Sequence, residues 1–201
     1  MPRRNDGTVR KLTELAARLK IDAIVQVGVG CASELSWLLP ATNHPKLYGF
    51  EASPRCMRYW KTAKYPGTLR HFAISDSDGE VTLHAGRHME RASLIPGERR
   101  GRKAVVPAIC LDTALAQFGP FGERILLWMD AEGWELPALS GGKRFLESVV
   151  AITAEVSEHG LESDAWPSRD KTRAAMSSAG FEFAFSMKRN GDCFVRREFA
   201  L

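Results

Sequence analysis

The chain has 201 residues, of which 44% are hydrophobic and 26% are charged. This length and composition suit one α/β domain with a well-buried core, and we predict a single domain over residues 1–201. No apolar run is long enough to cross a membrane, and the charged N-terminus lacks the apolar stretch of a signal peptide. We therefore expect a cytoplasmic protein that has no membrane partner.

The net charge of +4 comes largely from one basic segment, residues 86–103, whose glycines and proline predict a long loop. A solvated loop is one interpretation, and an anion-binding lid over an acidic or phosphorylated ligand is the other. No recognition-helix pattern or interleaved aromatic residues favour nucleic acid as a partner. The four cysteines show no paired metal-ligand spacing, which argues against zinc and against a disulfide framework.

Helices and strands alternate through the first half of the chain. Apolar periodicity predicts an N-terminal helix over residues 8–20, within the segment 1–20. Ser33 and Ser53 are good N-cap residues, and they predict helices that end at Pro40 and near residue 64. Apolar and alternating runs predict four strands in this half of the chain: 23–27, 46–51, 69–74 and 80–84.

The same alternation continues after the basic loop. The apolar run 124–129 suits a central parallel strand that is buried on both faces. Gly180 is a typical left-handed cap for a helix over 165–179, and Asn190 followed by Gly191 predicts a terminal β-hairpin. The remaining expected elements are strand 104–109, helix 112–118, helix 135–146, strand 149–156, and the hairpin strands 181–187 and 192–198.

This order predicts an α/β fold with a Rossmann-like, seven-stranded, mostly parallel sheet and a C-terminal antiparallel hairpin. An all-parallel dehydrogenase sheet would lack the hairpin. The predicted architecture instead resembles the class I fold of S-adenosylmethionine-dependent methyltransferases.

A nucleoside-cofactor site is predicted by a strand, a glycine turn, a helix and a second strand that ends in an acid. Gly28 and Gly30 form the turn, and Glu51 follows about 20 residues later. Glycines let the backbone approach a ligand at a helix N-terminus, and an acid at the next strand end can bond ribose hydroxyls.

Four sequence blocks resemble the FkbM family of methyltransferases. They are residues 25–33, 48–54, 73–83 and 127–135, the last followed by 154–157. The Asp-x-Glu-Gly-x-Glu pattern that begins at Asp130 is the most specific of these when it occurs beside the Ser-Asp-x-Asp-Gly-Glu-Val pattern that begins at Ser75. The resemblance implies an S-adenosylmethionine-dependent O-methyltransferase whose acceptor is a hydroxyl of a sugar or another small metabolite. The basic loop favours an anionic acceptor.

The first motif departs from the family pattern Asp-x-Gly-x-Asn-x-Gly, because Gln26, Gly30 and Ala32 replace its polar and last glycine positions. Glutamine is neutral and attracts a cationic cofactor less strongly, although it still forms hydrogen bonds. Two alternatives therefore remain open: a degenerate cofactor-binding module without transfer activity, and an NAD-dependent oxidoreductase.

The fold and the resemblance together imply which residues contact S-adenosylmethionine. Gly28 and Gly30 would contact the methionine part, Glu51 the ribose, and residues 74–76 the adenine. The complete set of expected cofactor-binding residues is Gln26, Gly28, Gly30, Glu51, Ala73, Ile74, Asp76 and Asp130.

The expected catalytic residues are Asp130, Glu132 and His159. Asp130 ends a buried strand, where an unpaired carboxylate is costly, so it needs a partner such as the cofactor ammonium, a metal or a substrate hydroxyl. His159 is the leading candidate for a general base, with Glu155 and Glu158 as rivals. Asp130 and Glu132 could support a divalent cation, but the sequence shows no third ligand, so no metal is predicted.

Overall fold

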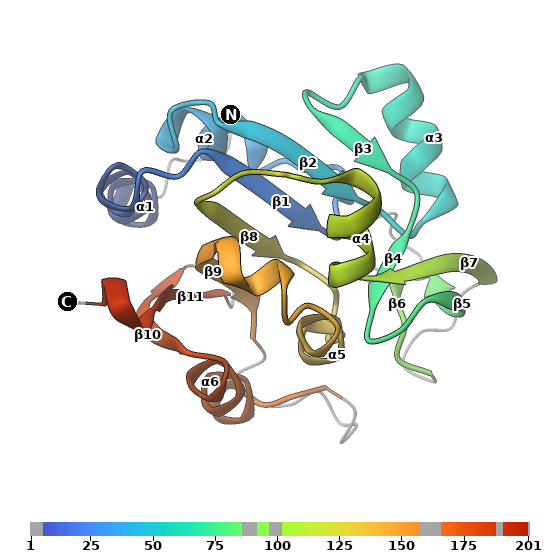
Figure 1. The fold of residues 1–201 in the computed structure, drawn as a ribbon. Helices are drawn as coiled ribbons and strands as arrows, with labels where there is room; N and C mark the ends of the chain where they lie inside the picture. The colour runs from blue at the N-terminus through green and yellow to red at the C-terminus, as the bar shows by residue number, and fades with distance from the viewer. Residues whose placement is uncertain (1–5, 86–91, 97–101, 157–165, 188–190, 201) are drawn as a thin grey trace.

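A computed structural model describes residues 6–85, 92–96, 102–156, 166–187 and 191–200 (Figure 1). The helices are α1 (Asp6–Leu19), α2 (Leu35–Ala41), α3 (Pro54–Ala63), α4 (Leu111–Phe118), α5 (Glu135–Ser140) and α6 (Arg169–Ser178), with the 3₁₀ turns η1 (Phe145–Ser148) and η2 (Arg197–Phe199). The strands are β1 (Ala23–Val27), β2 (Lys46–Phe50), β3 (Thr68–Arg70), β4 (Ala73–Ser75), β5 (Gly79–Ala85), β6 (Ala92–Ser93), β7 (Lys103–Cys110), β8 (Ile125–Met129), β9 (Val149–Glu155), β10 (Phe181–Met187) and β11 (Gly191–Arg196).

The main sheet has seven strands in the order β10-β11-β9-β8-β1-β2-β3. Strands β9, β8, β1, β2 and β3 run parallel, and β11 pairs antiparallel with both β9 and β10. The predicted seven-stranded, mostly parallel sheet with a terminal hairpin is therefore confirmed. All five residues of β1 and of β8 are buried, which explains their almost continuous apolar sequences.

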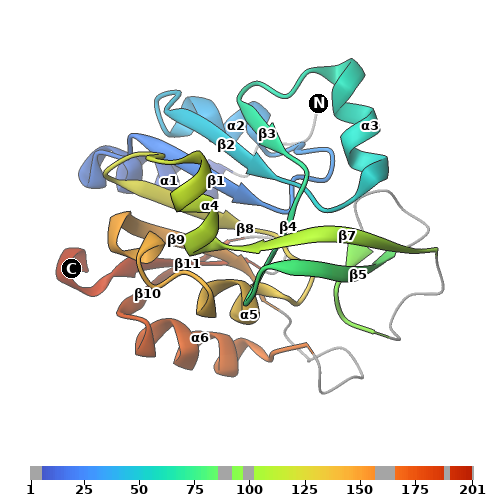
Figure 2. The same cartoon turned by 45° about the vertical axis from the view of Figure 1, so that its right-hand side comes forward.

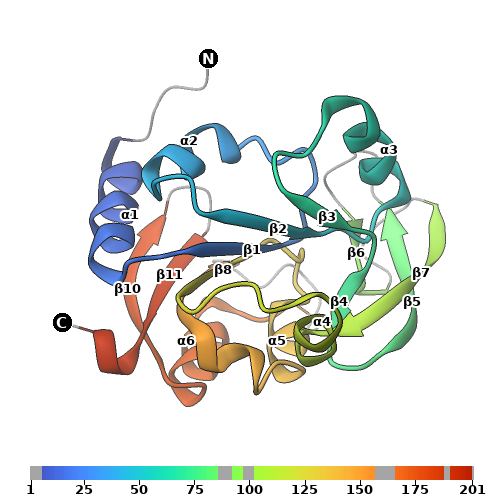
Figure 3. The ribbon, with the colours of Figure 1, turned by 45° about the horizontal axis from the view of Figure 1, so that its top comes forward.

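Helices cover both faces of this sheet (Figure 3). One face packs against α1 and α2, with Leu12, Leu38 and Trp128 in a shared apolar cluster. The other face packs against α4, α5 and α6 through a second cluster that contains Phe145 and Met176. Parallel strands that are buried on both faces place their carboxyl ends at one edge, between the two helical layers.

A second sheet, in the order β4-β7-β5-β6, projects from one side of the main sheet (Figure 2). The expected single strand 69–74 is wrong, because the chain leaves the main sheet at His71 and continues as β4 in the second sheet. The His71 ring nitrogen Nε2 lies 3.1 Å from the Ala52 carbonyl oxygen at this corner. The expected loop 86–103 also contains β6 and the first residue of β7, while residues 86–91 and 97–101 lie outside the described part.

Several expected helices have different bounds in the structure. The helix expected over 165–179 begins at Arg169, because Ser168 is its N-cap and accepts a hydrogen bond from the Lys171 N–H. The helix expected from Ser33 begins at Leu35, because the positive φ of Ala32 (48°) extends the preceding turn. The helix expected over 135–146 ends at Ser140. A Cβ atom on Gly141 would lie 2.7 Å from the Cys110 Cβ atom, so the chain needs glycine there to pass close to β7. By contrast, Ser53 caps α3 as predicted, and accepts a hydrogen bond from the Cys56 N–H.

Among the described helices, none combines the length and the apolar character that a bilayer span requires.

Candidate active site

A cavity of about 1730 Å³ opens at the carboxyl ends of the parallel strands. This is the edge at which open α/β sheets bind ligands. Small-molecule sites typically enclose about 300–1,000 Å³, so the cavity has room for two reactants. Its walls come from the turn after β1, the ends of β2, β8 and β9, the beginning of β4 and one face of α1.

The glycine turn after β1 is shaped by the segments that it contacts. Gly28 has a φ of +76°, and a Cβ atom there would lie 1.9 Å from the Asp130 carbonyl oxygen. The Gly28 N–H donates to the Phe50 carbonyl oxygen (3.0 Å), so the turn connects the ends of β2 and β8. Gly30 also has a positive φ, of 52°, and both glycines line the cavity. Gly28 is therefore required by a close contact within the protein as well as by its place beside the cavity.

Glu51 lies beside the turn and binds its backbone. Its Oε2 atom accepts hydrogen bonds from the Val29 N–H (2.9 Å) and the Gly30 N–H (2.7 Å), and Oε1 accepts from the Ser53 N–H (2.6 Å). These bonds use three of the roughly four acceptor positions of the carboxylate. Burial raises the pKa of Glu51, and the three backbone hydrogen bonds oppose that shift. A bond to a ribose hydroxyl would use the remaining position or replace one of these donors.

Gln26 is fully buried, and its side chain is not part of the cavity wall. Its Nε2 atom donates to Glu34 Oε1, and its Oε1 atom accepts from the Tyr65 hydroxyl (2.9 Å). Gln26, which replaces the aspartate of the family motif, therefore holds the side chain of Glu34, and Glu34 lines the cavity.

The residues expected beside adenine separate into two groups. Ala73 and Ile74 line the cavity together with Phe72 and Leu83, and make this end of it apolar. Asp76 is exposed and outside the cavity wall, and its Oδ1 atom accepts from the Ser75 and Ser77 hydroxyls at 3.1 Å. Asp76 therefore binds its neighbours in the turn between β4 and β5 and, contrary to expectation, it does not line the cavity.

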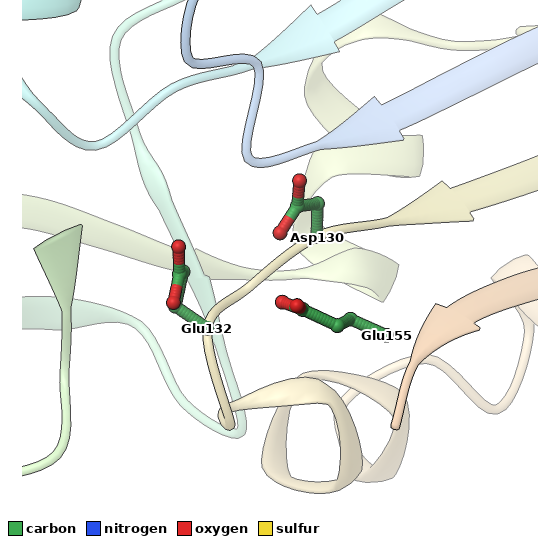
Figure 4. A group of neighbouring side chains, drawn as sticks. All are labelled: Asp130, Glu132 and Glu155. Atoms are coloured by element: carbon green, nitrogen blue, oxygen red, sulfur yellow. The ribbon is translucent and has the colours of Figure 1, made fainter. Parts of the chain in front are cut away.

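Three carboxylates converge near the ends of β8 and β9: Asp130, Glu132 and Glu155 (Figure 4). One oxygen from each lies within 4.8 Å of the others. The Asp130 side chain is exposed to the cavity, and the protein atoms that surround it raise its pKa above the ordinary value, as do the charges of Glu155, Glu132 and Glu135. The structure thus brings Asp130 and Glu132 to one point and adds Glu155, which the sequence had indicated only as an alternative general base. His159 lies outside the described residues.

Glu135 holds the backbone of the loop that carries Asp130 and Glu132. The Glu135 Oε1 atom accepts from the Ala131 N–H (2.9 Å) and the Gly133 N–H (3.3 Å), and its side chain is 1% exposed. Burial raises the pKa of Glu135 to about 7. The Ser93 hydroxyl of β6 donates to the Glu132 carbonyl oxygen (2.7 Å), which connects the loop to the second sheet.

The family model of the methyltransferase FkbM domain matches residues 26–183, which is most of the chain. The chain belongs to the FkbM methyltransferase family. It is therefore an S-adenosylmethionine-dependent methyltransferase, and the NAD-dependent alternative is wrong. No curated protein sequence is significantly similar to it.

Solved structures show the same fold as this FkbM methyltransferase at low sequence identity. The sugar N-methyltransferase KedS8 from Streptoalloteichus is 9% identical, with 94% of this chain and 86% of that chain covered and a TM-score of 0.52. DesVI from Streptomyces venezuelae is 9% identical, with 94% and 90% covered and a TM-score of 0.51. Fibrillarin from Aeropyrum pernix, with natively bound S-adenosyl-L-methionine, is 10% identical, with 92% and 72% covered and a TM-score of 0.50.

The cavity of the FkbM methyltransferase fits the chemistry of S-adenosylmethionine. The cofactor has an apolar, planar adenine at one end and two cationic groups, a sulfonium and an ammonium, at the other. The cavity likewise has an apolar wall at Phe72 and Ile74, and acidic side chains at Glu34, Asp130 and Glu155. A cation beside Asp130 would favour its charged form, which its surroundings and the neighbouring acids disfavour.

Glu34 and Thr153 line the cavity but were not expected there. Glu34 follows a turn whose length was not visible in the sequence. Thr153 lines the cavity from a strand that is otherwise apolar. A signal was available for Thr153 and Glu155, because they occupy alternate positions at the carboxyl end of a predicted buried strand, where ligand-binding side chains occur.

Proposed function

We propose that this methyltransferase transfers the methyl group of S-adenosylmethionine to a hydroxyl of a sugar or another small metabolite. The observation that carries the proposal is a pair of carboxylates, Asp130 and Glu155, in the wall of a cavity large enough for two reactants, with the Glu132 carboxylate beside them. A hydroxyl must lose its proton during methyl transfer, and a carboxylate close to it can accept that proton.

The cofactor supplies a methyl carbon on a positive sulfur, which leaves readily when a nucleophile approaches in line. The glycine turn and Glu51 would hold the methionine and ribose parts, and Ala73 and Ile74 would contact the adenine. Within this assignment, Asp130 lies between the turn and the other acids, since Gly28 packs against its carbonyl. The main contribution of the protein is then alignment of the acceptor oxygen with the methyl carbon.

Asp130 is the proposed proton acceptor, with Glu132 and Glu155 beside it. The Asp130 side chain is exposed to the cavity, where an acceptor hydroxyl can reach it, and its raised pKa suits a general base better than that of an ordinary aspartate. His159, the base expected from the sequence, stays a prediction because it lies outside the described residues.

An acceptor screen tests the assignment to oxygen. Labelled S-adenosylmethionine would be incubated with the enzyme and with sugars and small metabolites that carry hydroxyls, in parallel with matched amino analogues. We expect label transfer to at least one hydroxyl compound and weaker transfer to its amino analogue. Faster transfer to amines would contradict an oxygen acceptor. Cofactor binding without transfer across the panel would favour the degenerate-module alternative.

A further inference from the structure

We propose that Asp130, Glu132 and Glu155 bind one divalent cation of the Mg²⁺, Mn²⁺ or Ca²⁺ class, at the edge of the cavity where β8 and β9 end. The three residues come from different segments. Asp130 directly follows β8, Glu132 lies in the loop before α5, and Glu155 is the last residue of β9 (Figure 4).

The spacing of the carboxylate oxygens suits one cation. One oxygen from each residue lies within 4.8 Å of the other two. With metal–oxygen distances of about 2.0–2.6 Å, two oxygens that bind the same cation are roughly 3–5 Å apart. The ligand set consists only of carboxylate oxygens, and such sets select hard cations over zinc or copper.

A second observation comes from Thr153, which is not part of the acidic group. Its side chain is 1% exposed, and its hydroxyl has no hydrogen-bond partner among the described residues. Thr153 lines the same cavity, two residues before Glu155 and therefore on the same face of β9. A buried hydroxyl without a partner is costly, and a hydrated cation beside it would supply one through its water ligands.

The main-chain environment also fixes the geometry of the cluster. Glu132 has a φ of +51°, and Gly133 follows with a φ of +96°. Glu135 holds the loop through the Ala131 and Gly133 N–H groups, and its Oε2 atom is buried without a hydrogen-bond partner among the described residues. The loop is therefore held with its two acids directed toward Glu155, although Glu132 and Glu155 also make other contacts.

A cation held by three protein oxygens keeps further coordination positions for water or for a ligand oxygen. The positions that face the cavity would bind the acceptor hydroxyl and lower its pKa, so that its proton passes to the Asp130 oxygen that does not bind the cation as the oxygen–methyl bond forms. This role in acceptor binding rests on the proposed function, whereas the cation site itself does not.

The test is a calorimetric titration of metal-stripped protein with Mn²⁺, followed by removal of the cation with EDTA. We expect one Mn²⁺ ion per chain. Glu155→Gln and Glu132→Gln should each weaken Mn²⁺ binding by at least about tenfold, since even changes outside the ligand set weaken metal sites by about 10–100-fold. Glu147→Gln, which alters an acid of η1 outside the cavity, should bind Mn²⁺ like the unchanged protein.

A parallel titration with S-adenosylhomocysteine in EDTA separates the two proposals. Cofactor binding without saturable Mn²⁺ binding, or equal Mn²⁺ affinity in all four proteins, would overturn the cation site and leave the proposed function intact. Mn²⁺ binding without cofactor binding would support the cation site and contradict the proposed function. Thermal melts in EDTA check that each variant folds. If one of the two ligand variants does not fold, the other still tests the cation site.

Discussion

The two sides of the cavity satisfy their polar groups in opposite ways. At the glycine turn, the Glu51 carboxylate accepts three backbone N–H groups, so the protein meets most of its own hydrogen-bonding needs. At the ends of β8 and β9, three carboxylates face one another, and the charges of Glu132 and Glu155 raise the pKa of Asp130. The glycine turn therefore has most of its hydrogen bonds without a ligand, whereas the carboxylate group would be stabilised most by a positively charged ligand.

The largest expected effect is that of Asp130→Asn on the acidic side. Removing the proposed proton acceptor should lower kcat/KM by about 10²–10⁴-fold. Because the substitution also removes repulsion, the variant should melt at a temperature no lower than that of the unchanged enzyme. Label transfer and thermal melts measure the two quantities, and Asp170→Asn on the exposed start of α6 is the matched control. Full activity in Asp130→Asn would contradict the proposed role.

Gly28→Ala tests the scaffold side through the packing of the turn. The new Cβ atom would meet the Asp130 carbonyl at 1.9 Å, in a residue whose φ is +76°. Strain and overpacking together should lower the free energy of unfolding by about 2–5 kcal/mol. Gly180→Ala is the control for φ alone, because Gly180 has a φ of +89° and a Cβ atom there would have no neighbour within 4 Å. Chemical denaturation should show a smaller loss there, and equal losses would refute the packing argument.

The pH dependence of stability tests the loop that supports the acids. Burial raises the pKa of Glu135 from its ordinary 4.5 to about 7. The folded state then holds this proton more tightly, so the stabilisation is present below pH 4.5 and is lost as the pH rises through 7. In EDTA, the unchanged protein should lose roughly 3 kcal/mol relative to Glu135→Gln between about pH 5 and pH 8. Parallel stability curves for the two proteins would show that Glu135 does not titrate in this way.

Glu51→Ala is expected to have the smallest effect of the four substitutions. It removes the acceptor of the Val29, Gly30 and Ser53 N–H groups, and water from the adjoining cavity can replace it at most of them, so the loss of stability should be about the 1–3 kcal/mol expected for one unsatisfied donor. The loosened turn should also weaken S-adenosylhomocysteine binding, measured by calorimetry. Unchanged affinity would show that Glu51 supports the turn without contributing to the cofactor site.

The order of elements along the chain was enough to predict the main sheet and the position of the glycine turn. Strands that alternate with helices must place their carboxyl ends at one edge, so Gly28, Gly30 and Glu51 were expected beside a ligand site, and they line the cavity. The passage from β3 to β4 was not predictable, because a strand that changes sheets has the same apolar pattern as a continuous one.

Side-chain partners far apart in the sequence were the main features that the sequence did not show. Gln26 was expected at the cofactor, yet its amide binds Glu34 and Tyr65. Glu155 meets Asp130 because β9 pairs with β8 in a register that places Met129 opposite Ala154. Neither the neighbouring strand nor its register can be deduced from the local pattern of either strand.

The most direct test of the cofactor site is a calorimetric titration of the unchanged protein with S-adenosylhomocysteine in EDTA, with NAD titrated in parallel. We predict micromolar, one-to-one binding of S-adenosylhomocysteine and no binding of NAD. If the folded protein does not bind S-adenosylhomocysteine, the assignment of the cavity is contradicted. Gln26 and Gly30 would then be the first residues to change back to the aspartate and asparagine of the family motif.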